Sequence, residues 1–74
     1  MSRDEILRTL KGLIKKHDTS FAVRLRYMTA TGKVKKRHGE FVALHDDQEL
    51  VLFNSDKVTE GRYQLDRIVE IKKQ

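Results

Sequence analysis

The feature that most constrains the fold of this 74-residue chain is a single change in the spacing of its apolar residues. From Ile6 to Ile14 they recur every three or four residues, which places them in an arc of about 120° on a helix. From Phe21 to Tyr27 they recur every second residue, which is the pattern of a half-buried strand, and short apolar runs bounded by polar turns follow it. The sequence therefore predicts one N-terminal helix followed by a series of antiparallel strands.

The boundaries of these elements follow from local signals. Ser2 and Glu5 have the spacing of a capping box, so we expect the helix at about residues 3–17. Gly32 marks the first turn, Gly39 a bulge or bend within a long second strand, and Asp66-Arg67 a turn before the last strand. The expected strands lie at about residues 21–30, 33–45, 49–54, 62–66 and 68–72.

The predicted fold class is mainly β with one N-terminal α-helix, in a single domain over residues 1–74. Five short strands cannot lie flat and cover both faces of a core. Strong twist therefore favours curling into an SH3-like or Sm-like small antiparallel barrel, with the helix closing one end. An open α+β sheet with the helix on one face is the alternative.

Composition narrows the functional classes. The chain has no cysteine, which excludes disulfides and thiolate metal sites. Its longest apolar runs have four residues, against the ~20 that span a bilayer, and its N-terminal residues lack the apolar segment of a signal peptide. We therefore expect a cytoplasmic location, no membrane association and no cofactor.

Charge is unevenly distributed along the chain. Residues 21–40 contain six basic side chains and one acidic one, whereas residues 41–60 contain one basic and five acidic. Because the basic block coincides with the strongest strand pattern, we expect a fixed positive surface that attracts polyanions. The candidate nucleic-acid-binding residues are Arg24, Arg26, Lys33, Lys35, Lys36, Arg37, Arg62 and Arg67. A solvated, solubilising face would explain the same charges.

The register of the first hairpin affects this surface. A turn at Thr31-Gly32 would place Arg26 opposite Arg37, where two like charges destabilise the pair unless an anion lies between them. A longer loop would instead pair Arg26 with His38 and Arg24 with Glu40. The sequence leaves both registers open.

Aromatic residues are the second kind of candidate. Tyr27 and Tyr63 could stack on unpaired bases, although Tyr27 falls in the apolar phase and core packing also explains it. The exposed helix face with Arg8, Lys11 and Lys15 could extend a polyanion track or be an ordinary solvated surface.

Metal and catalytic chemistry have little support. His45, Asp46, Asp47 and Glu49 could together ligate a cation, but a polar hairpin loop explains them equally. No phosphate-binding glycine loop, nucleophile elbow or metal-ligand spacing occurs. The sequence predicts a non-enzymatic protein.

The order of motifs over residues 22–71 resembles that of WYL domains. The run Val23-Arg24-Leu25-Arg26-Tyr27 precedes a Gly32 turn, and Gln64-Leu65-Asp66-Arg67-Ile68 closes the pattern, with Arg37 and Leu50-Val51-Leu52 between them. The resemblance implies an Sm-like barrel of bacterial and phage transcription regulators that bind nucleic acid or a small effector, with site positions at Tyr27, Arg37 and Arg67.

The chain departs from the WYL pattern at several positions. The Trp-Tyr pair that names the family is absent, Gln64 and Gly61 stand where arginines are usual, and Glu40 stands where proline is usual. The chain is also similar to the short bacterial Rho-inhibitor proteins, which are Sm-like too and close on a comparable Leu-Asp-Lys-Ile run.

These observations together predict a small regulatory protein that binds RNA or single-stranded DNA through its basic first hairpin. The alternative is a protein-interaction module or self-associating adaptor that uses the acidic stretch 46–60.

Overall fold

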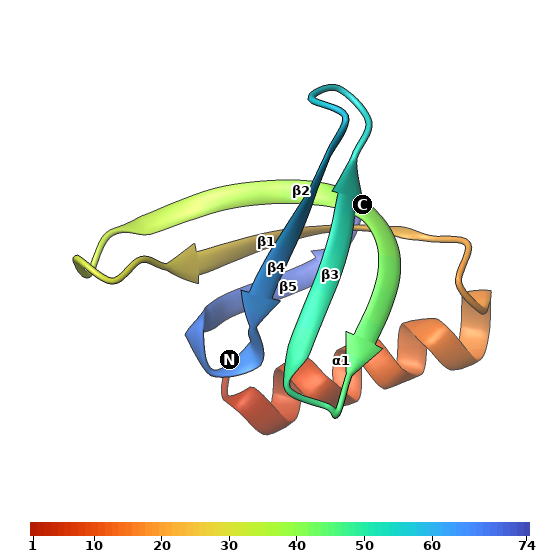
Figure 1. Ribbon diagram of the computed structural model, residues 1–74. Coiled ribbons are helices and arrows are strands. Elements are labelled where there is room, and N and C mark those ends of the chain that lie inside the picture. The colour runs from red at the N-terminus through yellow and green to blue at the C-terminus, as the bar shows by residue number, and fades with distance from the viewer.

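One helix and five strands make up the structure, a computed structural model that describes residues 1–74 (Figure 1). The elements are helix α1 (Arg3–His17), strands β1 (Ala22–Met28), β2 (Val34–His45), β3 (Glu49–Asn54) and β4 (Thr59–Gln64), the 3₁₀ turn η1 (Leu65–Arg67), and strand β5 (Ile68–Lys73). The prediction of a mainly β chain with one N-terminal helix is therefore confirmed.

The strands form a single antiparallel sheet in the order β4-β3-β2-β1-β5. β4 and β5 are its two edges and do not pair with each other, so the sheet is not closed into the expected barrel. The reason is local: η1 follows β4 directly and turns the chain, and β5 then pairs with β1 on the far side of the sheet. Figure 1 shows β3 and β4 crossing over β1 and β5, with β2 curving through both halves.

The bend in β2 arises from two features. The register with β3 shifts between Phe41 and Ala43, so the extra residue of the bulge is Val42 rather than the expected Gly39. Gly39 is needed for close packing: a Cβ built there would lie 2.9 Å from the carbonyl oxygen of Phe53. The absence of a side chain thus lets β2 cross β3 at short range.

Replacing Gly39 by alanine should therefore destabilise the fold by about 1–3 kcal/mol, the usual cost of an overpacked contact. Gly12→Ala is the matched control, since no atom lies within 4 Å of the added Cβ and alanine favours a helix interior by roughly 1 kcal/mol. Urea unfolding followed by circular dichroism measures both. Equal stability of the two variants would contradict the packing role of Gly39.

The core lies between the bent sheet and α1. Helix residues Ile6 and Leu10 are completely buried against β5, η1 and the strands. The other side chains of this core cluster are Phe21, Val23, Leu25, Leu50, Leu52, Leu65, Ile68 and Ile71. No helix in the structure combines the length and the apolar character needed to cross a membrane.

The N-terminal residues fix one end of the helix and one edge of the sheet. The predicted capping box is confirmed, because the Ser2 hydroxyl accepts from the Glu5 amide and the Glu5 carboxylate accepts from the Ser2 amide. The Met1 amine donates to the carbonyl of Val69 at 2.9 Å. This contact occupies one acceptor on the free edge of β5.

Three predicted strand boundaries differ from the structure by more than one residue. The fourth strand ends at Gln64 instead of residue 66, because Leu65 already belongs to η1. The fourth strand begins at Thr59 instead of residue 62, because Asn54 Oδ1 accepts from the amides of Asp56 and Lys57 and closes a tight turn. The first strand ends at Met28 instead of residue 30. There the Thr29 amide donates to the Lys33 carbonyl at 2.7 Å and closes a five-residue loop.

Candidate functional site

The first hairpin adopts neither of the two registers considered from sequence. Arg26 lies opposite Lys36, rather than opposite Arg37 or His38, and Arg24 lies opposite His38. The five-residue loop sets this register. It still places two like charges opposite each other, now Arg26 and Lys36.

The basic side chains of this hairpin divide between two faces of the sheet. On β1, Leu25 and Tyr27 point toward the core, so Arg24 and Arg26 point to the outer face. Lys36 shares the outer face with them, whereas Lys35 and Arg37 pair with Tyr27 and Leu25 and lie on the inner side. The candidate cations of the hairpin therefore do not share one positive surface, because consecutive strand residues alternate in direction.

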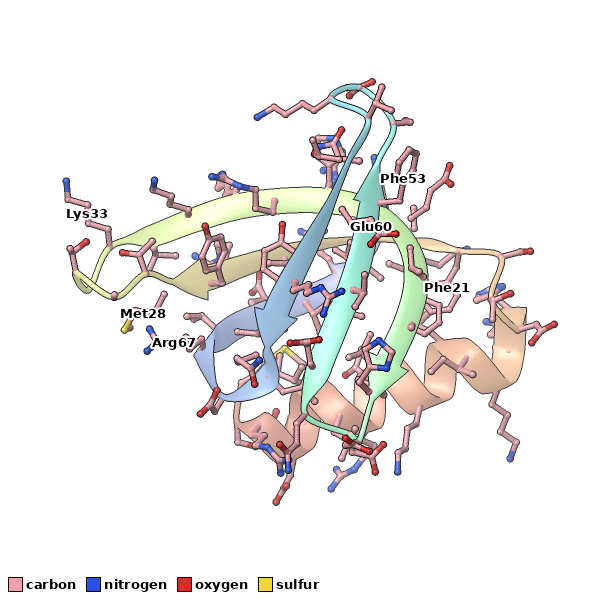
Figure 2. The ribbon with its side chains drawn as sticks, viewed as in Figure 1. Phe21, Met28, Lys33, Phe53, Glu60 and Arg67 are labelled. Atoms are coloured by element: carbon pink, nitrogen blue, oxygen red, sulfur yellow. The ribbon has the colours of Figure 1, made fainter.

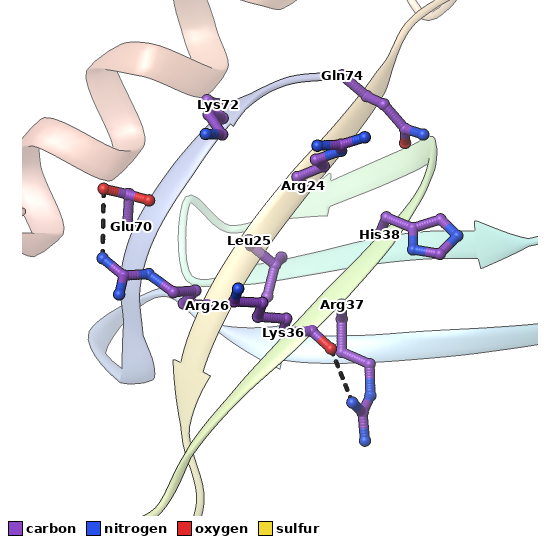
Figure 3. A pocket seen from close by; sticks show the side chains of 9 residues that line it. All are labelled: Arg24, Leu25, Arg26, Lys36, Arg37, His38, Glu70, Lys72 and Gln74. Carbon is purple, nitrogen blue, oxygen red and sulfur yellow. Dashed lines mark hydrogen bonds and ion pairs between the residues drawn. The ribbon is translucent and has the colours of Figure 1, made fainter.

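The outer face nevertheless holds a groove that β5 completes. It has a volume of about 440 Å³ and is lined by Arg24, Leu25, Arg26, Lys36, Arg37, His38, Glu70, Lys72 and Gln74; we call it the basic groove (Figure 3). Five of the lining residues are Lys or Arg and one is acidic. Lys72, which sequence reasoning missed, becomes part of the groove only because β5 pairs with β1.

Two rows of side chains cross the three strands of this groove. The first row is His38, Arg24 and Lys72, and the second is Lys36, Arg26 and Glu70. Each row contains one residue from β2, one from β1 and one from β5. Arg24 is thus the centre of a row that contains no carboxylate.

Ion pairs neutralise only part of this charge. Arg26 contacts Glu70 at 3.3 Å, as the dashed line in Figure 3 shows, and His38 contacts Asp56 at 3.6 Å. No carboxylate oxygen lies within 4.0 Å of Arg24, Lys36 or Lys72. These three cations repel one another, and a bound polyanion would relieve that repulsion.

The remaining candidate cations lie elsewhere. Lys33 is at the hairpin tip, and the Arg37 side chain runs away from Arg24 in Figure 3 and donates to the Lys36 carbonyl at 2.8 Å (Figures 2 and 3). Arg62 contacts Glu49 at 3.6 Å, and Arg67 belongs to η1. The fold thus does not bring these residues into the basic groove, apart from Arg37 at its margin.

The structure brings the two candidate aromatic residues together on the inner side. The rings of Tyr27 and Tyr63 meet edge-to-face, with centroids 5.3 Å apart and planes inclined at 61°. The Arg37 guanidinium carbon lies 5.7 Å from the centre of the Tyr27 ring. Burial raises the pKa of the Tyr63 phenol, against an opposing effect of Arg37, so this phenol is neutral at pH 7.

The acidic residues considered for metal binding have other partners. Asp47 contacts Lys11 at 3.0 Å, and Glu49 contacts Arg62 and accepts from Gln64. Asp46 and Asp47 both have positive φ, as the central residues of a tight hairpin turn do. No group of three or more potential metal ligands converges anywhere in the structure.

Comparison of the chain with protein-family models, with curated proteins and with solved structures finds no match in any of the three.

Proposed function

We propose that the chain is a small, non-enzymatic regulatory protein that binds RNA or single-stranded DNA through the basic groove. The observation that carries the proposal is Arg24, which has a basic neighbour on each side and no carboxylate partner. Lys36 and Lys72 add two more unpaired cations on the same face. Phosphates are the abundant anions that such an open, polar groove suits.

The finer fold assignment is part of this proposal. The bend of β2 and the η1 turn before β5 support a relation to SH3-like or Sm-like small barrels. In this chain the edge strands β4 and β5 do not pair, so such a barrel would be open. The similarity to WYL domains supports a role in transcription regulation in bacteria. The cytoplasmic location stays a prediction.

The alternative of an interaction surface at residues 46–60 has less support. Three of the five acidic side chains in this stretch, Asp47, Asp56 and Glu49, contact Lys, His or Arg side chains of the same chain. Asp47 and Asp56 also lie in turns at opposite ends of β3, so they do not share one patch. Self-association and a protein partner remain predictions without a structural feature that favours them.

A salt titration tests the proposed function. We expect three or four phosphate contacts, made by Arg24, Lys36 and Lys72 with or without Arg26. A plot of the logarithm of the association constant against the logarithm of salt concentration should then have a slope of about −2 to −3 for a single strand. Fluorescence anisotropy of a labelled oligonucleotide gives this slope. Affinity that does not change with salt would contradict phosphate binding in the groove.

A further inference from the structure

A second depression lies on the other side of β1 from the basic groove. It has a volume of about 290 Å³, at the small end of the range for ligand sites. Its walls are the end of β1 with the residues that follow it, 27–30, and the corner between β4 and η1. We call this depression the tyrosine slot, because Tyr27 and Tyr63 form part of its lining.

The two tyrosines provide a half-exposed aromatic surface. Each is partly buried, and their edge-to-face contact holds both rings in place. Met28, which is 45% exposed, adds a flexible apolar side chain to the lining. A flat, apolar ring system could therefore be covered on one side here without displacing the core.

One cation at the rim of the slot is free. Arg67 has no carboxylate oxygen within 4.0 Å, and its side chain lies beside Met28 in Figure 2. The other polar residues of this rim are occupied, since Arg62 and Gln64 both contact Glu49. The slot thus combines an aromatic wall with a single unpaired guanidinium.

The slot and the basic groove adjoin each other across β1. Arg26 lines the groove and the next residue, Tyr27, lines the slot. Both pair with β5, the edge strand that η1 leads into. A flexible single strand could pass around this edge from one face of the sheet to the other.

We infer that the tyrosine slot binds one unpaired nucleobase and that Arg67 contacts a phosphate next to this base. The base belongs to the same strand whose other phosphates occupy the basic groove. This inference rests on the proposed function. Every base has a π face that can stack on tyrosine, but in a duplex both faces are already stacked. The slot would therefore make the protein prefer single-stranded nucleic acid without preferring a particular sequence.

Abasic substitution tests this inference without altering the protein. A short mixed-sequence DNA strand is prepared with one abasic site at each position in turn, which keeps every phosphate and removes a single base. We expect one position at which the loss of the base weakens binding about 10-fold, the effect of losing one stacked base. Abasic strands that all bind as tightly as the intact strand would overturn the inference and leave the proposed function standing.

Substitutions at Tyr63 then locate the base. The Tyr63→Leu variant should bind the intact strand about 10-fold more weakly than the wild type does. For the abasic strand that lacks the important base, the variant and the wild type should have the same affinity, because the base that Tyr63 would contact is already missing. Tyr63→Phe should bind the intact strand like the wild type, because stacking needs only the ring. Phe53→Leu is the control, since Phe53 is also partly buried but lies outside the slot, near the β3–β4 turn (Figure 2).

The outcomes distinguish the two proposals. A Tyr63→Leu variant that loses affinity equally for intact and abasic strands would overturn base binding in the slot. Failure of every oligonucleotide to bind the wild-type protein, at low salt, would overturn both this inference and the proposed function.

Discussion

An Arg24→Glu variant is expected to bind single-stranded oligonucleotides on the order of 10- to 100-fold more weakly than the wild type. Arg24 is the only groove residue with a basic neighbour on both adjacent strands, His38 on one side and Lys72 on the other. The substitution removes a charge-assisted contact to phosphate, worth about 1.5–3 kcal/mol, and supplies a carboxylate that the two neighbours can contact. Binding anisotropy at fixed salt measures the loss.

The same variant should fold at least as well as the wild type. Glutamate at position 24 would lie opposite Lys72, so it would replace the repulsion between two cations by attraction on an exposed surface. A thermal melt of the variant should therefore show an unchanged or slightly raised Tm. Loss of binding together with a stable fold would separate the role of Arg24 from a structural one.

Lys15→Glu is the matched control for charge. Lys15 is exposed on α1 and does not line the basic groove, yet its substitution changes the net charge by the same amount. We expect its affinity to fall far less than that of Arg24→Glu. Equal losses would mean that overall charge, and not the groove, attracts the oligonucleotide.

Leu10→Ala should have the largest effect on stability. Leu10 is fully buried and packs α1 against the sheet, so its truncation should cost about 2–5 kcal/mol in lost burial and cavity formation. A domain of this length is stable by only about 4–11 kcal/mol. A substantial fraction of the variant should therefore be unfolded well below the Tm of the wild type.

Urea unfolding of Leu10→Ala is compared with that of Arg8→Ala. Arg8 is exposed on the same helix, and its replacement should change the free energy of unfolding by no more than about 0.5 kcal/mol. If Leu10→Ala were as stable as Arg8→Ala, the helix would be an appendage that contributes little to the core. That result would contradict the packing seen between α1 and the strands.

The sequence predicted a helix or strand well where the residues that stabilise it lie close together in the chain. The capping box of Ser2 and Glu5 and the apolar stripe through Leu10 involve residues within one or two helical turns. The strand pattern likewise identified the residues that face the core, such as Val23 and Leu25. Turn geometry was less predictable, because the side-chain bonds of Asn54 and the closure at Thr29 depend on details of a few backbone atoms.

The candidate site could be predicted only in part. Arg24 and Arg26 were identifiable from the charge block, but Lys72 and Glu70 are some 45 residues away and reach them only through the β1–β5 pairing. The meeting of Tyr27 with Tyr63 depends in the same way on the bend of β2 and on the path of η1. Neither arrangement leaves a periodic signal in the sequence.

The amino-acid sequence by itself determined the helix, the number of strands and which side chains of β1 face the core, since these follow from apolar spacing and local hydrogen bonding. Only the tertiary structure decided which cations share a surface, whether the sheet closes and which side chains of β5 stand beside those of β1. Those outcomes depend on register and on long-range pairing. A shift of one residue in register moves a charge to the opposite face while leaving the sequence pattern unchanged.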